Sequence, residues 1–447
     1  MKKISVLLAT NTPKAYNYLM PDDFESEVGT FVKVPFRNRE LMGIIWDQSL
    51  EKIENSKLKE IIEYYPSFKL SDRKLDFINF FSRYNFTSLG GVIKLFIPHP
   101  YLIEKNKSIK RYKLDKKNID KITITNARKT VLEFFENETK FFTSSDLIKK
   151  TNVSSSVINK LIEENVLKAV EYEEQNNTDK VYSKKFDLNK HQTKAANNII
   201  NSIKNNKFER FLIDGVTGSG KTEVYFEAVE EALKENKQSL ILLPEISLTD
   251  SLFDRIKVRF GFEPSMWHSN LSKKKRRDIW QDIYHGNSKL IIGARSSLFL
   301  PFKNIGLIVV DEEHDHSYKQ QEGIIYHARD MAISLASFEK IPVVMVSATP
   351  SLESVLNVKE GKYKNLVLPE RIGDAILPEI DFIDMRDEEY IKNQWISEKL
   401  KVEIKKALSR KEQSLIFLNR RGYAPITLCK SCGHRLECPK CDSYLDY

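Results

Sequence analysis

FLIDGVTGSGKTEVYFEAVEEALK, residues 211–234, is the stretch that decides the fold. An apolar, strand-like run comes first, a glycine-rich loop follows, and a helical pattern begins directly after the loop. The loop matches G-x-x-x-x-G-K-[ST], whose glycines let backbone N–H groups surround phosphate oxygens at the start of a helix. We expect Lys221 to reach the β- and γ-phosphates of a nucleotide and Thr222 to ligate Mg²⁺. The predicted nucleotide-binding residues of the loop are Gly215, Gly218, Ser219, Gly220, Lys221 and Thr222.

The chain around this loop alternates short apolar runs with helical stretches. The runs are FLIDG, SLILLP, KLIIGA, LIVVDEEH, PVVMVSAT and SLIFLNR, in that order. Near-continuous Val, Ile and Leu separated by helices is typical of a parallel sheet that is covered on both faces. The sequence therefore predicts an α/β domain.

Two further motifs follow strand-like runs. Asp311 and Glu312 come directly after IGLIVV, where we expect Asp311 to hold Mg²⁺ and Glu312 to orient and deprotonate the attacking water. Ser347-Ala-Thr349 follows VVMV, and its hydroxyls can link a nucleotide site to a nucleic-acid groove. In this order behind the phosphate loop, the two motifs indicate a helicase or translocase.

Composition excludes several classes of protein. The 447 residues allow roughly three or four domains, and 41% hydrophobic residues are enough for packed cores. With 16 glycines and 15 prolines, the chain is neither collagen-like nor dominated by linkers. The net charge of +9 suits a nucleic-acid partner. No stretch approaches the ~20 apolar residues of a membrane span, so we expect a cytoplasmic protein without a membrane partner.

The N-terminal half contains two smaller units. Residues 28–46 predict a β-hairpin that turns at Arg37-Asn38-Arg39, and helical patterns follow near 71–84. Residues 125–172 read as helix, helix, turn, helix and strand, with Thr143 and Ser144 as caps and Asp146 close behind. This pattern is typical of a winged helix, which either contacts nucleic acid or serves as a protein-interaction module.

All four cysteines lie near the C-terminus. They form two C-x-x-C pairs, which in a chain of this kind indicate zinc rather than disulfides. The gap between the pairs is far shorter than the ~15–20 residues usual for a zinc ribbon. A single site that uses all four thiolates is one alternative, and His434 is expected to be a turn residue. The predicted ligands are Cys429, Cys432, Cys438 and Cys441.

Six motifs in order resemble one family along nearly the whole chain. They are GVTGSGKTEVY, LLPEISLT, GARSSLFLPF, DEEHDHSYKQQEGIIYHARD, SATPSLES and FLNRRGYAP. The chain is similar to the primosomal replication-restart helicases of helicase superfamily 2. The resemblance implies ATP as cofactor, branched and single-stranded DNA as partners, and single-stranded DNA-binding protein and other primosome proteins as protein partners. Another superfamily 2 translocase is disfavoured by FLNRRGYAP followed by the paired cysteines.

The resemblance also implies roles for individual residues. Gln192 is expected to contact the adenine of ATP. His314, Ser347 and Thr349 are expected to couple the ATP site to DNA. The residues expected to face DNA are Glu245, Thr249, Arg295 and Ser296, together with Tyr326 and Arg329 of an aromatic-rich loop at 318–330.

The N-terminal unit resembles the family's module for the 3′ end of a nascent strand. Tyr16-Asn17-Tyr18 stands where the family has Phe-Asp-Tyr, and Arg37 stands where it prefers glycine. Asn17 keeps an acceptor for a 3′-hydroxyl but loses the charge. Arg37 either crowds the pocket or adds a phosphate contact.

The resemblance sets the expected architecture, a multidomain α/β protein whose C-terminal part is incomplete. The domains are 1–104, a β-rich 3′-end DNA-binding domain; 105–185, a winged helix with its linker; 186–375, a RecA-like ATPase lobe; 376–428, the start of a second lobe; and 429–447, a partial zinc-binding region.

The incompleteness bears on the expected activity. In the family eight cysteines bind two zinc ions, so each site would be half present here. By the resemblance, we also expect the family's catalytic arginine of the second lobe to be missing from these 447 residues, and such a residue is worth roughly 10³–10⁵ in rate. We therefore expect little ATP turnover from this chain. The alternative is a non-catalytic, structure-specific DNA-binding fragment that also binds ATP.

Overall fold

The computed structural model describes residues 1–47, 53–103, 111–115, 118–119, 122–136, 141–170, 186–244, 250–372, 379–384 and 396–417. The chain divides into two compact units, Met1–Gly373 and Asp374–Tyr447. Among the described residues, no helix has both the length and the apolar character needed to cross a membrane.

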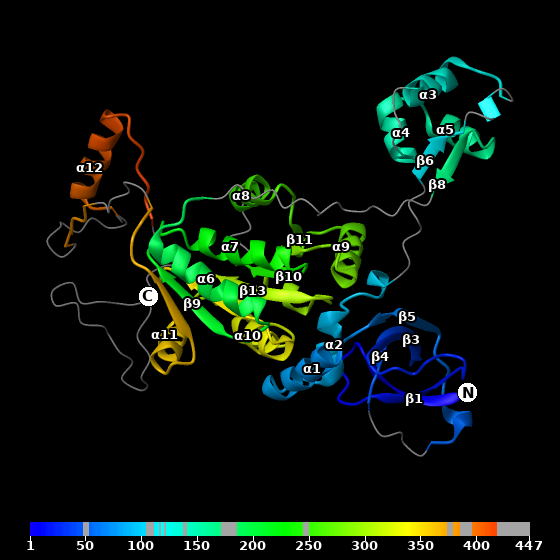
Figure 1. Ribbon diagram of the computed structural model, residues 1–447, viewed down its shortest axis with the longest axis horizontal. Helices are drawn as coiled ribbons and strands as arrows, with labels where there is room; N and C mark the ends of the chain where they lie inside the picture. The colour runs from blue at the N-terminus through cyan, green and yellow to red at the C-terminus, as the bar shows by residue number, and fades with distance from the viewer. Residues whose placement is uncertain are drawn as a thin grey trace. The chain divides into compact units, whose positions relative to one another are not determined.

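The larger unit contains the predicted parallel sheet (Figure 1). Its strand order is β11-β12-β10-β13-β16-β9-β17, and every neighbouring pair is parallel. The strands are β9 (Arg210–Gly215), β10 (Gln238–Leu242), β11 (Ser265–Trp267), β12 (Leu290–Gly293), β13 (Ile305–Asp311), β16 (Val343–Ser347) and β17 (Lys364–Leu368). Five of these were predicted from the apolar runs. The edge strands β11 and β17 were not, because they are short or only half buried.

Helices cover both faces of this sheet. They are α6 (Lys190–Lys204), α7 (Lys221–Lys234), α8 (Asp250–Phe260), α9 (Lys273–His285), α10 (Ala328–Glu339) and α11 (Leu352–Lys359). Side chains of β13 alternate between two cores, because successive strand residues point to opposite faces. Leu307 and Val309 pack with α6 and α7, whereas Ile308 and Val310 pack with α10.

The N-terminal domain is a five-stranded antiparallel sheet of order β2-β1-β4-β3-β5. Its elements are β1 (Lys2–Leu8), β2 (Tyr16–Met20), β3 (Thr30–Phe36), β4 (Arg39–Ile45), β5 (Glu63–Lys69), α1 (Asp72–Tyr84) and α2 (Leu89–Phe96), with short 3₁₀ turns at Asn55–Lys57 and Pro100–Leu102. The predicted hairpin is confirmed as β3 and β4. Its turn holds Arg37 at a φ of 55°, in the region that glycine adopts most easily.

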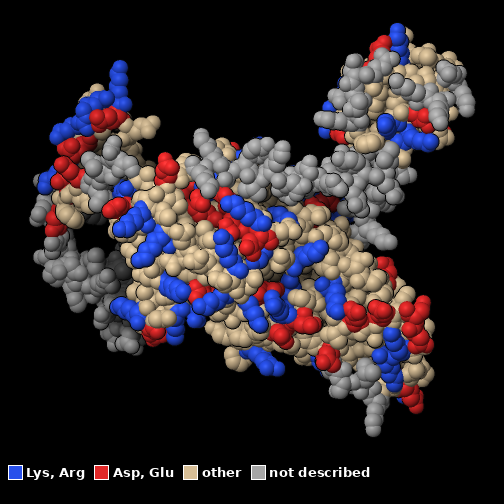
Figure 2. Space-filling model, viewed as in Figure 1, with Lys and Arg blue, Asp and Glu red and all other residues tan. Residues whose placement is uncertain are grey.

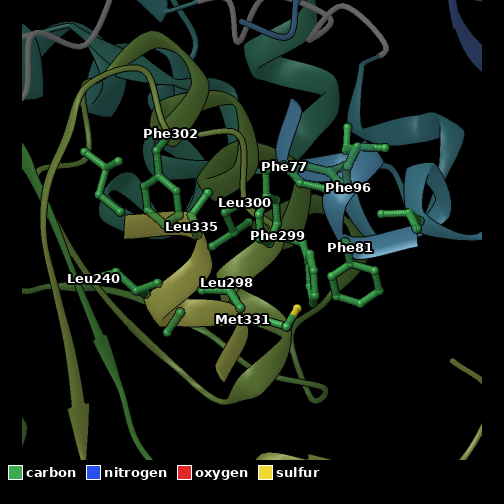
Figure 3. Close-up of a cluster of buried hydrophobic side chains, with 14 of the residues drawn as sticks. Phe77, Phe81, Phe96, Leu240, Leu298, Phe299, Leu300, Phe302, Met331 and Leu335 are labelled. Atoms are coloured by element: carbon green, nitrogen blue, oxygen red, sulfur yellow. The ribbon is translucent and has the colours of Figure 1, made fainter. Parts of the chain in front are cut away.

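One hydrophobic core joins the N-terminal domain to the parallel-sheet lobe (Figure 3). Phe81 of α1 and Phe96 of α2 each pack edge-on against Phe299 of the lobe, with ring centroids 5.5 and 5.7 Å apart. Phe299 belongs to the 3₁₀ turn Arg295–Phe299, and Met331 of α10 lies in the same cluster. We call this cluster the shared core.

Buried hydrogen bonds cross the same junction. The indole of Trp280 donates to the carbonyl of Phe96 at 3.3 Å, and the amide of Gln281 donates to that of Leu102 at 2.9 Å. Lys74 is buried, donates to the carbonyl of Phe302, and lies 3.5 Å from a carboxylate oxygen of Glu339. The two domains are thus joined by polar as well as apolar contacts.

Residues 111–170 form a separate small core. The elements are β6 (Arg111–Leu114), α3 (Asn126–Glu136), β7 (Phe142–Thr143), α4 (Ser144–Thr151), α5 (Ser155–Glu163) and β8 (Leu167–Val170), with an antiparallel sheet of order β7-β6-β8. The predicted cap is confirmed, since Thr143 and Asp146 form a capping box. Ile158 and Leu161 of α5 are fully buried in this core.

The second unit corrects one prediction. Its described helix is α12 (Glu398–Ser409). However, residues 414–417 of the predicted strand SLIFLNR carry no strand assignment, and Leu415 and Phe417 are more than 80% exposed. A strand needs a neighbour for its backbone N–H and C=O groups. None pairs with 414–417 among the described residues of this unit.

The face of the molecule drawn in Figure 2 carries mixed charge. On the face drawn in Figure 2, lysine and arginine are interspersed with aspartate and glutamate. The net charge of +9 therefore does not gather into one basic patch on this face.

The shared core makes a prediction about cooperativity. Phe299→Ala should cost about 3–5 kcal/mol, as for other buried Phe→Ala changes. It should lower the hydrogen-exchange protection of β1–β4 and of β10–β13 together. Phe142→Ala is the matched control, since Phe142 is buried in the separate core of residues 111–170. Loss of protection in the lobe alone would show that the two domains do not share a core.

Candidate functional site

The glycine-rich loop joins β9 to α7, as predicted. Gly218 and Gly220 have φ values of 82° and 78°, which residues with a Cβ adopt at a cost. Lys221 opens α7, and its ammonium donates to the carbonyls of Gly215 (2.9 Å) and Val216 (3.3 Å). Burial lowers the pKa of Lys221, against the opposing effect of Glu312 and Asp311. The lysine is therefore held beside the loop and close to two carboxylates.

Asp311 lies at the carboxyl end of β13, the edge where ligands bind in open parallel sheets. Its Oδ2 accepts a hydrogen bond from the hydroxyl of Tyr225 at 3.0 Å. Its Oδ1 accepts one from the backbone N–H of Glu312 at 2.9 Å. Burial and the neighbouring charge of Glu312 raise the pKa of Asp311 to about 6. A cation at this carboxylate would favour the ionised form.

Tyr225 was missed by the sequence analysis. Its hydroxyl donates to Asp311 at 3.0 Å, and the side chain of Thr222 also acts on its pKa, so Tyr225 lies beside the two residues predicted to hold Mg²⁺. Burial raises its pKa well above the ordinary value, so the phenol stays protonated. The available signal was its spacing, since Tyr225 follows Lys221 by four residues, one turn along the same helix.

The predicted coupling residues form one chain of contacts. His314 Nδ1 lies 3.6 Å from Oε2 of Glu312 and 2.8 Å from Oγ of Ser347. The hydroxyl of Ser347 also accepts the backbone N–H of Thr349 at 3.0 Å. Glu312 itself has a φ of 48°, an uncommon conformation for a residue with a side chain. The contacts connect the end of β13 to the end of β16.

Gln192 is buried and braces the phosphate loop. Its Oε1 accepts the backbone N–H of Asn189, and its Nε2 donates to the carbonyl of Ser219 at 2.9 Å. A Cβ at Gly220 would come within 2.5 Å of the same Nε2, so this glycine also permits the close approach. Contact of Gln192 with adenine stays a prediction.

The structure brings the predicted 3′-end residues together. Tyr16, Asn17 and Arg37 line one cavity of about 310 Å³, although they come from β2 and from the β3–β4 turn. The guanidinium of Arg37 lies 5.6 Å from the ring centroid of Phe36. Three lysines, Lys14, Lys57 and Lys59, add positive charge to the same lining. The cavity suits an anionic group.

The predicted DNA-facing residues of the lobe differ in exposure. Ser296 is exposed, and Arg295 donates to the carbonyl of Ser317 at 2.8 Å. Tyr326 is buried against Phe81 and Phe299. Contact of Tyr326 with DNA stays a prediction.

Arg329 is also buried, and it binds a residue that the sequence analysis missed. Its Nη1 donates to Glu313 at 3.0 Å. Glu313 is fully buried and also accepts from Ser351 and Ser354 at the start of α11. The sequence did offer one indication of its importance, because Glu313 is the third consecutive acidic residue after the apolar run IGLIVV. Contact of Arg329 with DNA stays a prediction.

Two groups of predicted residues lie outside the described part of the chain. They are Glu245 and Thr249, and the four cysteines Cys429, Cys432, Cys438 and Cys441.

Comparisons with known proteins agree with this geometry. A parallel sheet with a phosphate loop after β9 and acidic residues after β13 defines a RecA-like ATPase lobe. Residues 189–358 match the family model of the DEAD/DEAH box helicases, which implies ATP binding, and residues 5–98 match that of a 3′ DNA-binding domain.

Curated relatives extend the match to the whole chain. It is 37% identical to the replication restart protein PriA of Rickettsia conorii over 100% of its length, covering 58% of that protein. The PriA proteins of Haemophilus influenzae and Chlamydia pneumoniae are 37% and 33% identical over 100% and 99% of the chain, covering 62% and 61% of those proteins. The chain belongs to the PriA replication restart family, and it spans about three fifths of the length of these relatives.

The raised pKa of Asp311 predicts a pH-dependent stability. Between about pH 4 and pH 6 the unfolded chain ionises this carboxyl before the folded chain does, so ionisation costs the folded state up to about 3 kcal/mol. Asp311→Asn should therefore raise the melting temperature of the nucleotide-free protein at pH 7 and leave it nearly unchanged near pH 4. Thermal unfolding monitored by circular dichroism measures both.

Asp315→Asn serves as the control of opposite sign. Despite some burial, hydrogen bonds from Ser317 lower the pKa of Asp315, so its ionised form is favoured in the folded state. This variant should lose stability at pH 7. An equal gain for Asp311→Asn at both pH values would contradict the assignment.

Proposed function

We propose that this chain is the ATP-binding and DNA-binding part of a replication-restart helicase. The observation that carries the proposal is the arrangement of Lys221, Thr222 and Asp311 at the phosphate loop and the adjacent strand end, with the hydroxyl of Tyr225 donating to Asp311. ATP would lie with its phosphates on the loop and at the start of α7. The chain spans only about three fifths of the length of its relatives. The helicase activity of the whole protein is therefore a proposal for this chain.

The donor set fits Mg²⁺. A carboxylate and a hydroxyl are oxygen ligands of the kind that Mg²⁺ prefers, and Thr222 and Asp311 would hold the ion together with phosphate oxygens. Bound Mg²⁺ offsets the charge that develops on the phosphates during transfer. The protonated phenol of Tyr225 would hold the Asp311 carboxylate in position beside the hydroxyl of Thr222.

Glu312 would orient the attacking water and take its proton. Its side chain is partly exposed, so water can reach it. Through their hydrogen bonds, His314 and Ser347 would transmit a change in the position of the Glu312 carboxylate to Thr349. Thr349 would pass this change to the DNA-binding side of the lobe. Gln192 would hold the loop in the shape that admits phosphates.

DNA would contact two N-terminal modules. The 3′ end of a nascent strand would enter the cavity lined by Tyr16, Asn17 and Arg37. Residues 111–170 would act as a winged helix, a proposal supported by their helix–helix–strand order and antiparallel sheet. On the lobe, the single strand would run past Glu245, Thr249, Arg295 and Ser296, with Tyr326 and Arg329 beneath it. The protein partners would be single-stranded DNA-binding protein and other primosome proteins.

Zinc is proposed from the chemistry of the donors. Cys429 and Cys432 form one pair, Cys438 and Cys441 the other, and thiolate pairs at this spacing are typical zinc ligands. Each pair would supply two of the four ligands of one zinc ion.

The ATP proposal predicts the effect of removing the loop ammonium. Lys221→Ala should abolish measurable Mg-ATP binding, because the charge-assisted contact to the β- and γ-phosphates is lost. Isothermal titration calorimetry of the whole chain measures this. Lys234→Ala, which removes an ion-paired lysine at the other end of α7, should bind ATP like the wild type. Equal affinity in wild type and Lys221→Ala would reject the proposal.

The DNA proposal predicts a change in salt dependence. If Arg37 contacts a phosphate, Arg37→Ala should reduce the slope of log K against log salt by about 0.7–0.9 for a forked DNA with a recessed 3′ end. Fluorescence anisotropy at several salt concentrations gives the slope. Arg39→Ala is the matched control, since Arg39 is exposed on the same hairpin and does not line the cavity. Equal slopes for the two variants would remove Arg37 from the site.

A further inference from the structure

The phosphate loop is contacted by a segment from the far end of the larger unit. Strand β17 pairs in parallel with β9, and this register places Leu368 opposite Gly215, the first residue of the loop. The chain then continues to Ile372, whose backbone N–H donates to the carbonyl of Gly218 at 3.0 Å. We call residues 368–372 the loop brace. The sequence analysis assigned no role to this segment.

The side chains of the loop brace touch the loop at both of its ends. A Cβ placed on Gly215 would come within 2.9 Å of the Cβ of Leu368. A Cβ placed on Gly220 would come within 2.5 Å of Cδ1 of Ile372. Carbon atoms do not pack this closely, so both positions require glycine as long as the brace is in place. The loop and the brace are therefore fitted to one another.

The hydrogen bond from the brace helps to set the direction of the loop peptides. A planar trans peptide places its C=O and its N–H on opposite sides. Ile372 holds the carbonyl of Gly218, and the N–H of the same peptide, that of Ser219, closes a turn on the carbonyl of Val216 at 3.0 Å. Gln192 holds the next carbonyl, that of Ser219, which turns the N–H of that peptide away from Gln192. Carbonyls that point outward leave N–H groups to point inward, as a phosphate requires.

The exposure of Ile372 argues against a role in core packing. Leu368 belongs to the hydrophobic core beneath the sheet, whereas Ile372 is 54% exposed and lies outside the buried clusters of the described residues. An isoleucine in this position acts on the loop that it touches. It also stands next to Gly373, the residue at which the larger unit ends. The chain thus leaves this unit directly from the phosphate loop.

We propose that Ile372 is a positioning residue for the phosphate loop, and that occupation of the loop is linked through it to the segment where the chain leaves the larger unit. The proposal deepens the ATP-binding function proposed above and rests on it. Hydrogen-bonded peptides polarise one another, so phosphate bound to the loop N–H groups strengthens the loop carbonyls as acceptors. Linkage is reciprocal, so a brace that favours nucleotide binding is itself held more tightly when nucleotide is bound.

Calorimetry with two ligands tests the positioning role. Ile372→Ala should weaken the binding of Mg-ATP and of Mg-tripolyphosphate by the same factor, about three- to tenfold, because half-buried methyl groups that support the loop are lost. The two ligands share the phosphates, and only ATP carries a base. Ile372→Val keeps most of the apolar contact and should bind both ligands within about twofold of the wild type.

Val367→Ala is the matched control for this measurement. Val367 is 50% exposed, which is close to the exposure of Ile372, and it lies on β17 just before the loop brace. This variant should bind both ligands like the wild type. Thermal unfolding of each variant shows whether any loss of affinity accompanies a general loss of stability.

Hydrogen exchange, resolved to single residues by mass spectrometry, tests the linkage. Mg-ATP should slow exchange at the amide of Ile372 by about threefold or more, because nucleotide strengthens its bond to the loop. The amide of Gly361 is the control, since it donates to the carbonyl of Val358 at the same distance of 3.0 Å in an exposed turn after α11. Its exchange should be the same with and without Mg-ATP. Unchanged exchange at Ile372 would contradict the linkage.

The outcomes separate this proposal from the one on which it rests. If Ile372→Ala binds both ligands like Val367→Ala, or loses only melting temperature, the positioning role is wrong and ATP binding stands. If Ile372→Ala loses affinity for ATP alone, Ile372 acts on the base and its action through the loop is rejected. If the wild-type chain binds neither Mg-ATP nor Mg-tripolyphosphate, the ATP-binding function and the positioning role are both rejected.

Discussion

The shared core is the contact on which the rest of the larger unit depends. Phe81 and Phe96 of the N-terminal domain both pack against Phe299 of the lobe, and all three rings are buried. Burying a Phe side chain stabilises the folded state by about 1.5–3 kcal/mol. Because these rings are buried between the two domains, their burial stabilises both domains. Because Lys74 and Trp280 also donate hydrogen bonds across it, the junction has a specific geometry as well as a favourable area.

This junction explains how distant segments come to serve one function. The same 3₁₀ turn that supplies Phe299 also carries Arg295 and Ser296, which are predicted to face DNA. Arg295 in turn donates a hydrogen bond to the carbonyl of Ser317. The hydroxyl of the next residue, Tyr318, donates to the carbonyls of Leu242 and Asp311. A continuous set of packed and hydrogen-bonded groups therefore runs from the N-terminal domain to the carboxylate at the ATP site.

The sequence predicted those features whose chemistry is local. The phosphate loop, the strand that ends at Asp311 and the capping box of Thr143 each depend on residues within a few positions of one another. The hairpin at Arg37 was predicted for the same reason. The roles of Tyr225 and Glu313 could not be predicted in this way, because their partners lie tens of residues away along the chain. The strand predicted at 414–420 is not formed over its described part, 414–417, for a related reason: an apolar run forms a strand only beside a neighbour, and no described strand pairs with these residues.

The central claim is that the N-terminal domain and the lobe form one body around the shared core. Pulsed electron paramagnetic resonance tests it most directly, with spin labels carried by unnatural amino acids at positions 39 and 207 so that the native cysteines remain. Both positions are exposed, one on the N-terminal hairpin and one on the lobe. The account predicts a single narrow distance distribution that is unchanged when Mg-ATP or forked DNA is added. A broad distribution, or one that shifts on addition of either ligand, would contradict it.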